Sequence, residues 1–195
     1  PPDIMNVLAR TILLLYAYDE NAEDRSVQHE ISTAISLISR LPRIMVLTYY
    51  AIRARYNNES MIMHRFIPGQ STAETILSML RPDRQFTPEE ARMLDIMLCL
   101  HAEHGGGNNS SFTTRVMSSA DTDPYSVYAA AICSLKGKKH GGANHQVRAM
   151  QADIKQHVAN WEDDDEVADY LAKIVNKQAY DKSGLVYGMG HAVYT

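Results

Sequence analysis

The chain has 195 residues, a formal net charge of −4, 45% hydrophobic residues and 22% charged residues. This length is enough for one well-buried core, or for one domain and part of another, and the composition excludes a disordered chain. The basic residues are scattered and no apolar run reaches the roughly 18 residues of a membrane span, so we expect neither a nucleic-acid surface nor a membrane segment.

Helical periodicity dominates the first half of the chain. Apolar residues recur at helical spacing over residues 4–15 and 27–38, and a third stripe begins after Pro42. Ser-Thr-Ala-Glu at 71–74 is a capping box, which predicts a helix start. Thr-Pro-Glu-Glu opens the segment 87–105 in the same way, with proline at the first helical position.

The second half continues as helix. Residues 123–135 are apolar on most faces, which predicts a central helix, and two further helices are expected over 142–158 and 163–177. No Asn-Gly turn joins two alternating runs, so strand signals are few and the sequence predicts an all-α protein. The composition becomes more polar near Gly137, and we expect a domain junction there, with segments 1–137 and 138–195 on its two sides.

The two cysteines indicate a reducing compartment. Cys99 and Cys133 lie far apart inside apolar segments, so we expect buried free thiols and no disulfide framework. No signal or transit segment is visible, although the abrupt start on Pro1-Pro2 suggests that this is not the natural N-terminus. A cytoplasmic protein is therefore expected.

Three glycine-flanked histidines are the candidate functional residues. They are His104 in HAEHGGGNNS, His140 in KGKKHGGANHQV and His191 in LVYGMGHAVYT. Histidine exchanges a proton near neutral pH, and glycine lets a ligand or another backbone come close. Three such pairings predict one site assembled from separate segments.

His104 has two other interpretations. With His101 it forms a pair three residues apart, but a zinc helix of the metalloprotease kind needs ligands four apart with a glutamate after the first. We therefore expect no metal. A helix that ends in a glycine cap is the second interpretation, but three glycines and two asparagines exceed what a cap requires. The segment favours an oxygen-rich ligand.

His140 follows three lysines and precedes the helix expected from Gly142. The lysines and the positive end of that helix disfavour an imidazolium ion, and a neutral imidazole can donate an N–H to a carbonyl that becomes an enolate. The alternative is a basic loop with an incidental histidine. The turn around His191 has two glycines but lacks the lysine of a phosphate-binding Walker sequence.

Taken together, HAEHGGGNNSSFTTRV, SLKGKKHGGANHQV and GLVYGMGHAVYT resemble the citrate synthase family in its shorter, bacterial form. The resemblance extends over the whole chain and keeps the family's motif order and spacing. It implies a multihelical all-α fold in which 1–137 belongs to the large helical domain and 138–195 begins the small domain. It also implies a homodimer in the bacterial cytoplasm and no metal or redox cofactor.

The implied reaction is condensation of acetyl-CoA with oxaloacetate, followed by hydrolysis of citryl-CoA. His104 and Asn108 match positions that hold oxaloacetate. His140 matches the histidine that donates to the thioester carbonyl during enolisation, and His191 matches the one that polarises and protonates the oxaloacetate carbonyl. The adenine end of CoA is expected on the backbone of three residues: Leu185, Val186 and Gly188.

The sequence also departs from the family pattern. After a GHAVYT-like stretch the family carries an Asp-Pro-Arg element, the aspartate that removes the methyl proton, and more carboxylate-binding arginines, whereas this sequence ends at Thr195. Asp181 is not in a matching context. We therefore expect an internal fragment that, by itself, does not make citrate at a useful rate, since a positioned general base contributes about 10²–10⁴-fold.

Two alternatives stay open. A 2-methylcitrate synthase uses propionyl-CoA on a related scaffold, and one extra methylene is worth only about 1–3 kcal/mol of discrimination. The other alternative is not enzymatic: the chain is a helical fragment or assembly piece without turnover.

Overall fold

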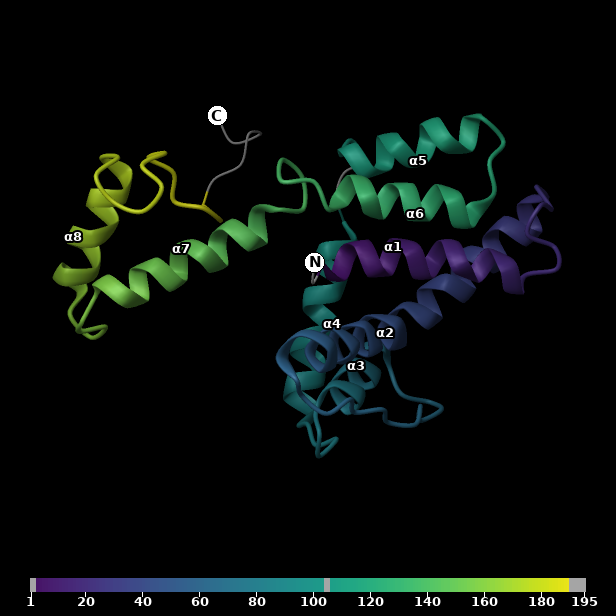
Figure 1. The fold of residues 1–195 in the computed structure, drawn as a ribbon, viewed down its shortest axis with the longest axis horizontal. Helices are drawn as coiled ribbons and strands as arrows, with labels where there is room; N and C mark the ends of the chain where they lie inside the picture. The colour runs from purple at the N-terminus through teal and green to yellow at the C-terminus, as the bar shows by residue number, and fades with distance from the viewer. Residues whose placement is uncertain (1–2, 104–105, 190–195) are drawn as a thin grey trace. The chain divides into compact units, whose positions relative to one another are not determined.

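A computed structural model of the chain describes residues 3–103 and 106–189. These residues contain α-helices, one short 3-10 helix and no strand, so the expected all-α class is confirmed (Figure 1). The chain divides into two compact units, Pro1–Lys136 and Gly137–Thr195. The elements are α1 (Ile4–Leu15), η1 (Tyr16–Tyr18), α2 (Val27–Asn57), α3 (Thr72–Leu80), α4 (Pro88–Ala102), α5 (Asn109–Ser119) and α6 (Pro124–Leu135) in the first unit, and α7 (Ala143–His157) and α8 (Asp164–Val175) in the second.

Side-chain caps explain where these helices begin. In every α-helix of the described residues except α7, the residue before the first turn accepts a hydrogen bond from a backbone N–H of that turn. Both predicted capping boxes, Ser71 with Glu74 and Thr87 with Glu90, are confirmed. Glu90 also accepts two hydrogen bonds from the Arg81 guanidinium, at 2.6 and 2.8 Å, which with the Thr87 N–H lowers the pKa of Glu90 to about 2.

Helix α6 is central in the first unit, as its apolar faces predicted. It lies between α1 and α5 and also contacts α2 (Figure 1). Its side chains share a core with α1 and α2, formed by Ile12, Ala22, Leu37, Tyr125 and Ala129. Burial of these apolar side chains stabilises the helical bundle by roughly 1.5–3 kcal/mol for each large residue.

Helix α2 runs through Pro42 without interruption. The expected two helices, 27–38 and a second after Pro42, are therefore one helix of 31 residues. A proline inside a helix costs about 3 kcal/mol, and packing at both ends of α2 offsets that cost. Leu37 belongs to the core with α1 and α6, and Tyr50 packs with Met79 of α3 and donates a hydrogen bond to the carbonyl of Leu80.

The apolar stripe at the start of α2 does not face this core. Val27, Ile31, Ile35 and Ile38 are 71%, 55%, 62% and 65% exposed. Their spacing places them on one face of the helix, which we call the α2 stripe. By length and composition alone α2 could also cross a membrane, but the core helices of soluble proteins can have the same length and composition.

The prediction of two buried thiols is wrong. Cys99 on α4 and Cys133 on α6 are both exposed. Apolar neighbours in sequence do not decide which face of a helix a residue occupies, since residues one apart lie about 100° apart around the axis. Neither thiol forms a disulfide in the part of the chain that the structure describes.

The second unit is built on the packing of α8 against α7. Met150 and Ile154 of α7 meet Tyr170 and Ile174 of α8 in a small core, which also includes Val158. The Tyr170 hydroxyl donates a hydrogen bond of 2.7 Å to Oδ2 of Asp153 on α7. Burial of the ring and this bond raise the pKa of Tyr170 to about 12.

Candidate functional site

His140 lies in a tight loop that leads into α7. Its backbone N–H donates to the carbonyl of Gly137 at 2.9 Å, and the N–H of Gly142 donates to the same oxygen at 3.2 Å. A Cβ at position 142 would lie 2.7 Å from Cα of Lys138, so only glycine allows this close approach. The loop therefore fixes the backbone of His140 two residues before the Gly142 N-cap of α7.

The start of α7 differs from the other helix starts. Gly142 has no side chain, and no side-chain hydrogen bond caps α7 within the described ranges 3–103 and 106–189. Lys138 and Lys139 are exposed and lie in the loop before it. A helix N-terminus and two ammonium groups all carry positive charge, so this end of α7 favours a carbonyl or anionic oxygen near His140.

The segment expected to receive CoA forms a turn over residues 186–189. The N–H of Met189 donates to the carbonyl of Val186 at 3.2 Å, and Gly188 has φ +88°. A positive φ at the third position of such a turn favours glycine. Val186 packs against the core of the second unit, whereas the side chain of Leu185 is 57% exposed.

Helix α7 brings the two segments into one unit. A Cβ at Gly188 would lie 3.0 Å from Cγ2 of Val147, in the second turn of α7. His140 precedes the first turn of the same helix. Of the predicted residues, the second unit therefore holds His140, Leu185, Val186 and Gly188, with α7 as their common support.

Asn108 belongs to the first unit and caps α5, a helix that was not predicted. Its Oδ1 accepts hydrogen bonds from the N–H of Ser111 at 2.9 Å and from the hydroxyl of Ser110 at 2.8 Å. Capping uses the amide oxygen, and an asparagine amide also has an NH₂ group that suits a carboxylate. His104 and His191 lie outside the described residues.

One contact around the predicted CoA segment was not expected from sequence. The hydroxyl of Tyr187 donates a hydrogen bond of 2.6 Å to Oδ2 of Asp181. This bond and the N–H of Ser183 lower the pKa of Asp181. No sequence motif predicts this hydrogen bond, because the bond depends on the path of the chain between the two residues.

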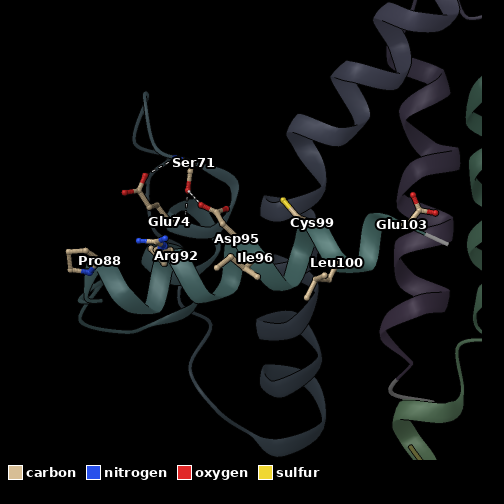
Figure 2. Close-up of a pocket in the computed structure, with 10 residues that line it drawn as sticks. Ser71, Glu74, Pro88, Arg92, Asp95, Ile96, Cys99, Leu100 and Glu103 are labelled. Atoms are coloured by element: carbon tan, nitrogen blue, oxygen red, sulfur yellow. Dashed lines mark hydrogen bonds between the residues drawn. The ribbon is translucent and has the colours of Figure 1, made fainter. Parts of the chain in front are cut away.

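A pocket of about 580 Å³ lies in the first unit, between the start of α3 and one flank of α4 (Figure 2). Two of its polar side chains take part in the start of α3: Asp95 accepts from the Ser71 hydroxyl at 3.2 Å and from the N–H of Ala73 at 3.3 Å. The lining does not include any of the predicted site residues that the structure describes. The residues 3–103 and 106–189 also place no group of three His, Cys, Asp or Glu side chains for a metal ion.

Comparison with protein families gives a match over the whole chain. The family model described as "Citrate synthase, C-terminal domain" matches residues 1–195. The citrate synthase of Synechocystis sp. is 32% identical over 195 residues, which are 100% of this chain and 43% of that relative. The 2-methylcitrate synthase 1 of Corynebacterium glutamicum is 30% identical over 194 residues, which are 97% of this chain and 46% of that relative.

The fold has a counterpart among solved structures. The crystal structure of citrate synthase from Thermotoga maritima superposes with a TM-score of 0.68 and 23% sequence identity, and the match covers 100% of this chain and 45% of that chain. At this identity the likeness concerns the fold. The chain spans less than half the length of the relatives that it matches.

Proposed function

This chain belongs to the citrate synthase family, and we propose that the protein containing it condenses acetyl-CoA with oxaloacetate to give citrate and CoA. The observation that carries the proposal is the arrangement around α7. The His140 loop leads into the uncapped start of this helix, and Gly188 packs against its second turn. Helix α7 thus supports both a proton donor, His140, and a glycine turn. This arrangement suits an enzyme that must hold a thioester and enolise it.

The proposed reaction proceeds in three steps. His140 donates a hydrogen bond to the thioester carbonyl oxygen while the acetyl methyl group loses a proton to a base outside this sequence. The enolate carbon then attacks the ketone carbon of oxaloacetate, and His191 gives a proton to the ketone oxygen as the carbon–carbon bond forms. Water hydrolyses the resulting citryl-CoA to citrate and CoA. Hydrogen bonding at the developing oxyanion stabilises the first transition state.

Substrate contacts complete the proposal. His104 and the amide group of Asn108 hold oxaloacetate, and the backbone of Leu185, Val186 and Gly188 receives the adenine end of CoA. Residues 1–137 then belong to the large domain and 138–195 to the first part of the small domain. No metal ion or redox cofactor takes part in these steps.

We further propose that the protein is a homodimer in the bacterial cytoplasm. The α2 stripe supports the dimer, because a contiguous exposed apolar patch on a helix face marks an interaction surface. The isolated chain is expected to turn over slowly, because the proposed base and the carboxylate-binding arginines are not among its 195 residues. Loss of a positioned base alone lowers the rate by about 10²–10⁴-fold.

A second candidate is the condensation of propionyl-CoA with oxaloacetate. The observation in its favour is the 30% identity to a relative named 2-methylcitrate synthase 1. The two candidates are distinguished by the ratio of kcat/KM for acetyl-CoA and propionyl-CoA. One methylene changes the activation free energy by about 1–3 kcal/mol, which sets the size of that ratio.

The test is an assay of free CoA thiol with the complete protein, oxaloacetate and either thioester. We expect a higher kcat/KM for acetyl-CoA than for propionyl-CoA, and a loss of about 10²–10⁴-fold in kcat for His140→Ala. The reverse preference supports the second candidate. No thiol release with either substrate contradicts both and supports a non-catalytic helical protein.

A further inference from the structure

We propose that Asp181 is a positioning residue that holds Tyr187, and through Tyr187 the turn over residues 186–189, in the conformation that binds CoA. The inference rests on the proposed function, since it assigns the CoA contact to the backbone around this turn. It adds a residue that no family motif marks.

The contact itself is short and has one ionised partner. The Tyr187 hydroxyl lies 2.6 Å from Oδ2 of Asp181, and Oδ1 of the same carboxylate accepts the N–H of Ser183 at 3.0 Å. An O–H···O⁻ bond of this length is about twice as strong as a bond between neutral groups. The lowered pKa of Asp181 is consistent with a carboxylate that stays ionised in this position.

The backbone around Asp181 is held in an unusual conformation. Tyr180 and Lys182, on either side of it, have φ values of +53° and +56°, which cost free energy in residues with a Cβ. Such conformations persist where the surrounding contacts fix them. The Tyr180 ring meets the Tyr187 ring edge-on, with centroids 6.2 Å apart, so Tyr187 is held through both its ring and its hydroxyl.

Tyr187 occupies the centre of the proposed CoA segment. It lies between Val186 and Gly188, and its own backbone is the second position of the turn closed by the Met189 N–H. Fixing the Tyr187 side chain therefore restricts the backbone that would contact CoA. A turn ordered before binding loses less conformational entropy when the ligand arrives.

The first test compares Asp181→Ala, Asp181→Asn and Tyr187→Phe in the complete protein by steady-state kinetics. We expect Asp181→Ala and Tyr187→Phe to raise KM for acetyl-CoA about three- to tenfold, with kcat and KM for oxaloacetate unchanged. Asp181→Asn retains an acceptor oxygen and should recover most of the loss. Asp169→Ala, which removes an exposed carboxylate of α8, is the matched control and should match the wild type.

The second test is independent of catalysis. Amide hydrogen exchange of Met189 reports the turn directly, because its N–H donates to Val186. Exchange should accelerate about three- to tenfold in Asp181→Ala and Tyr187→Phe. Unchanged exchange and unchanged KM in these variants overturn the positioning role while leaving the proposed function intact. A wild-type protein that binds no CoA by calorimetry, with CoA itself as the probe, overturns both.

Discussion

Gly188 lies so close to Val147 of α7 that a Cβ at position 188 would be 3.0 Å from the Cγ2 atom of Val147. The φ of Gly188 is +88°, so the backbone conformation and the available space both call for glycine. This contact fixes the distance between the proposed CoA turn and the helix that begins beside His140. The packing of α7 therefore determines where the turn can lie.

Replacement of Gly188 by alanine should loosen the turn. The left-handed backbone costs about 1–2 kcal/mol for a residue with a Cβ, and the contact with Val147 adds to that cost. We expect faster hydrogen exchange of the Met189 amide and weaker binding of CoA in Gly188→Ala. Exchange mass spectrometry and calorimetry on the complete protein measure the two effects.

Gly69 offers a matched control for this variant. Its φ is +86°, but a Cβ there would have nothing within 4 Å. Gly69→Ala should therefore lower the free energy of unfolding by the backbone cost alone. Gly188→Ala should lower it further, and a second change, Val147→Ala, should relieve that additional loss. An equal decrease in the free energy of unfolding in Gly69→Ala and Gly188→Ala would contradict a role for Val147.

Tyr125 and Asp19 should make stability depend on pH at both ends of the range. The Tyr125 hydroxyl donates to Oδ2 of Asp19 at 2.7 Å, and this bond is the main cause that lowers the pKa of Asp19 below its ordinary 3.8. Burial, followed by the same bond, raises the pKa of Tyr125 from 10.0 to about 12. The stabilisation is thus present between about pH 4 and pH 10, and is lost below pH 4 and as pH rises towards 12.

Tyr125→Phe should lower the free energy of unfolding by about 1–2 kcal/mol at pH 7, with a smaller difference from wild type below pH 4 and above pH 10. Urea titrations followed by circular dichroism at these pH values measure the change. Tyr128→Phe, on the same helix, is the control, because the Tyr128 hydroxyl makes no hydrogen bond to a carboxylate within residues 3–103 and 106–189. A pH-independent loss in Tyr125→Phe would exclude the assigned role of the bond.

Ser134 on α6 should tolerate, or benefit from, the loss of its hydroxyl. Its Oγ is buried and has no hydrogen-bond partner within residues 3–103 and 106–189. An unsatisfied buried polar group costs about 1–3 kcal/mol, so Ser134→Ala should leave the melting temperature unchanged or raise it. Ser78 is the contrasting case, since its buried hydroxyl donates to Gln70 at 2.9 Å, and Ser78→Ala should lower the melting temperature.

Local sequence signals predicted the helices well. The capping boxes at Ser71 and Thr87 are confirmed because a cap depends on residues only three positions apart. The continuity of α2 through Pro42 was not predictable in this way, because the packing that offsets the proline comes from α1, α3 and α6. Helix α5 was missed since its N-cap, Asn108, was interpreted only as a ligand-binding residue.

The residues of the candidate site were predictable from sequence, whereas the contacts that hold them in place were less so. Glycine patterns marked the His140 loop and the turn at Gly188, and the structure gives physical reasons for both glycines at positions 142 and 188. The contact between Tyr187 and Asp181 was invisible, because it depends on left-handed residues that no short pattern encodes. Roles of individual residues in the reaction stay predictions.

The α2 stripe should decide the oligomeric state of the complete protein. Burying side chains such as Ile31 and Ile35 against a second copy removes them from water, which stabilises association by roughly 25 cal/mol for each Å² of apolar surface. A lysine in that interface must lose its hydration without a partner, so Ile35→Lys should convert dimer to monomer. Sedimentation velocity measures the change.

Ser32→Lys adds the same charge to the same exposed turn of α2, outside the stripe, and should leave the sedimentation coefficient unchanged. Because a lysine on a solvated helix surface changes stability by less than about 0.5 kcal/mol, the pair of variants separates an interface effect from a folding effect. A dimer that persists in Ile35→Lys, or a wild-type protein that sediments as a monomer, would contradict a dimer interface on this face of α2.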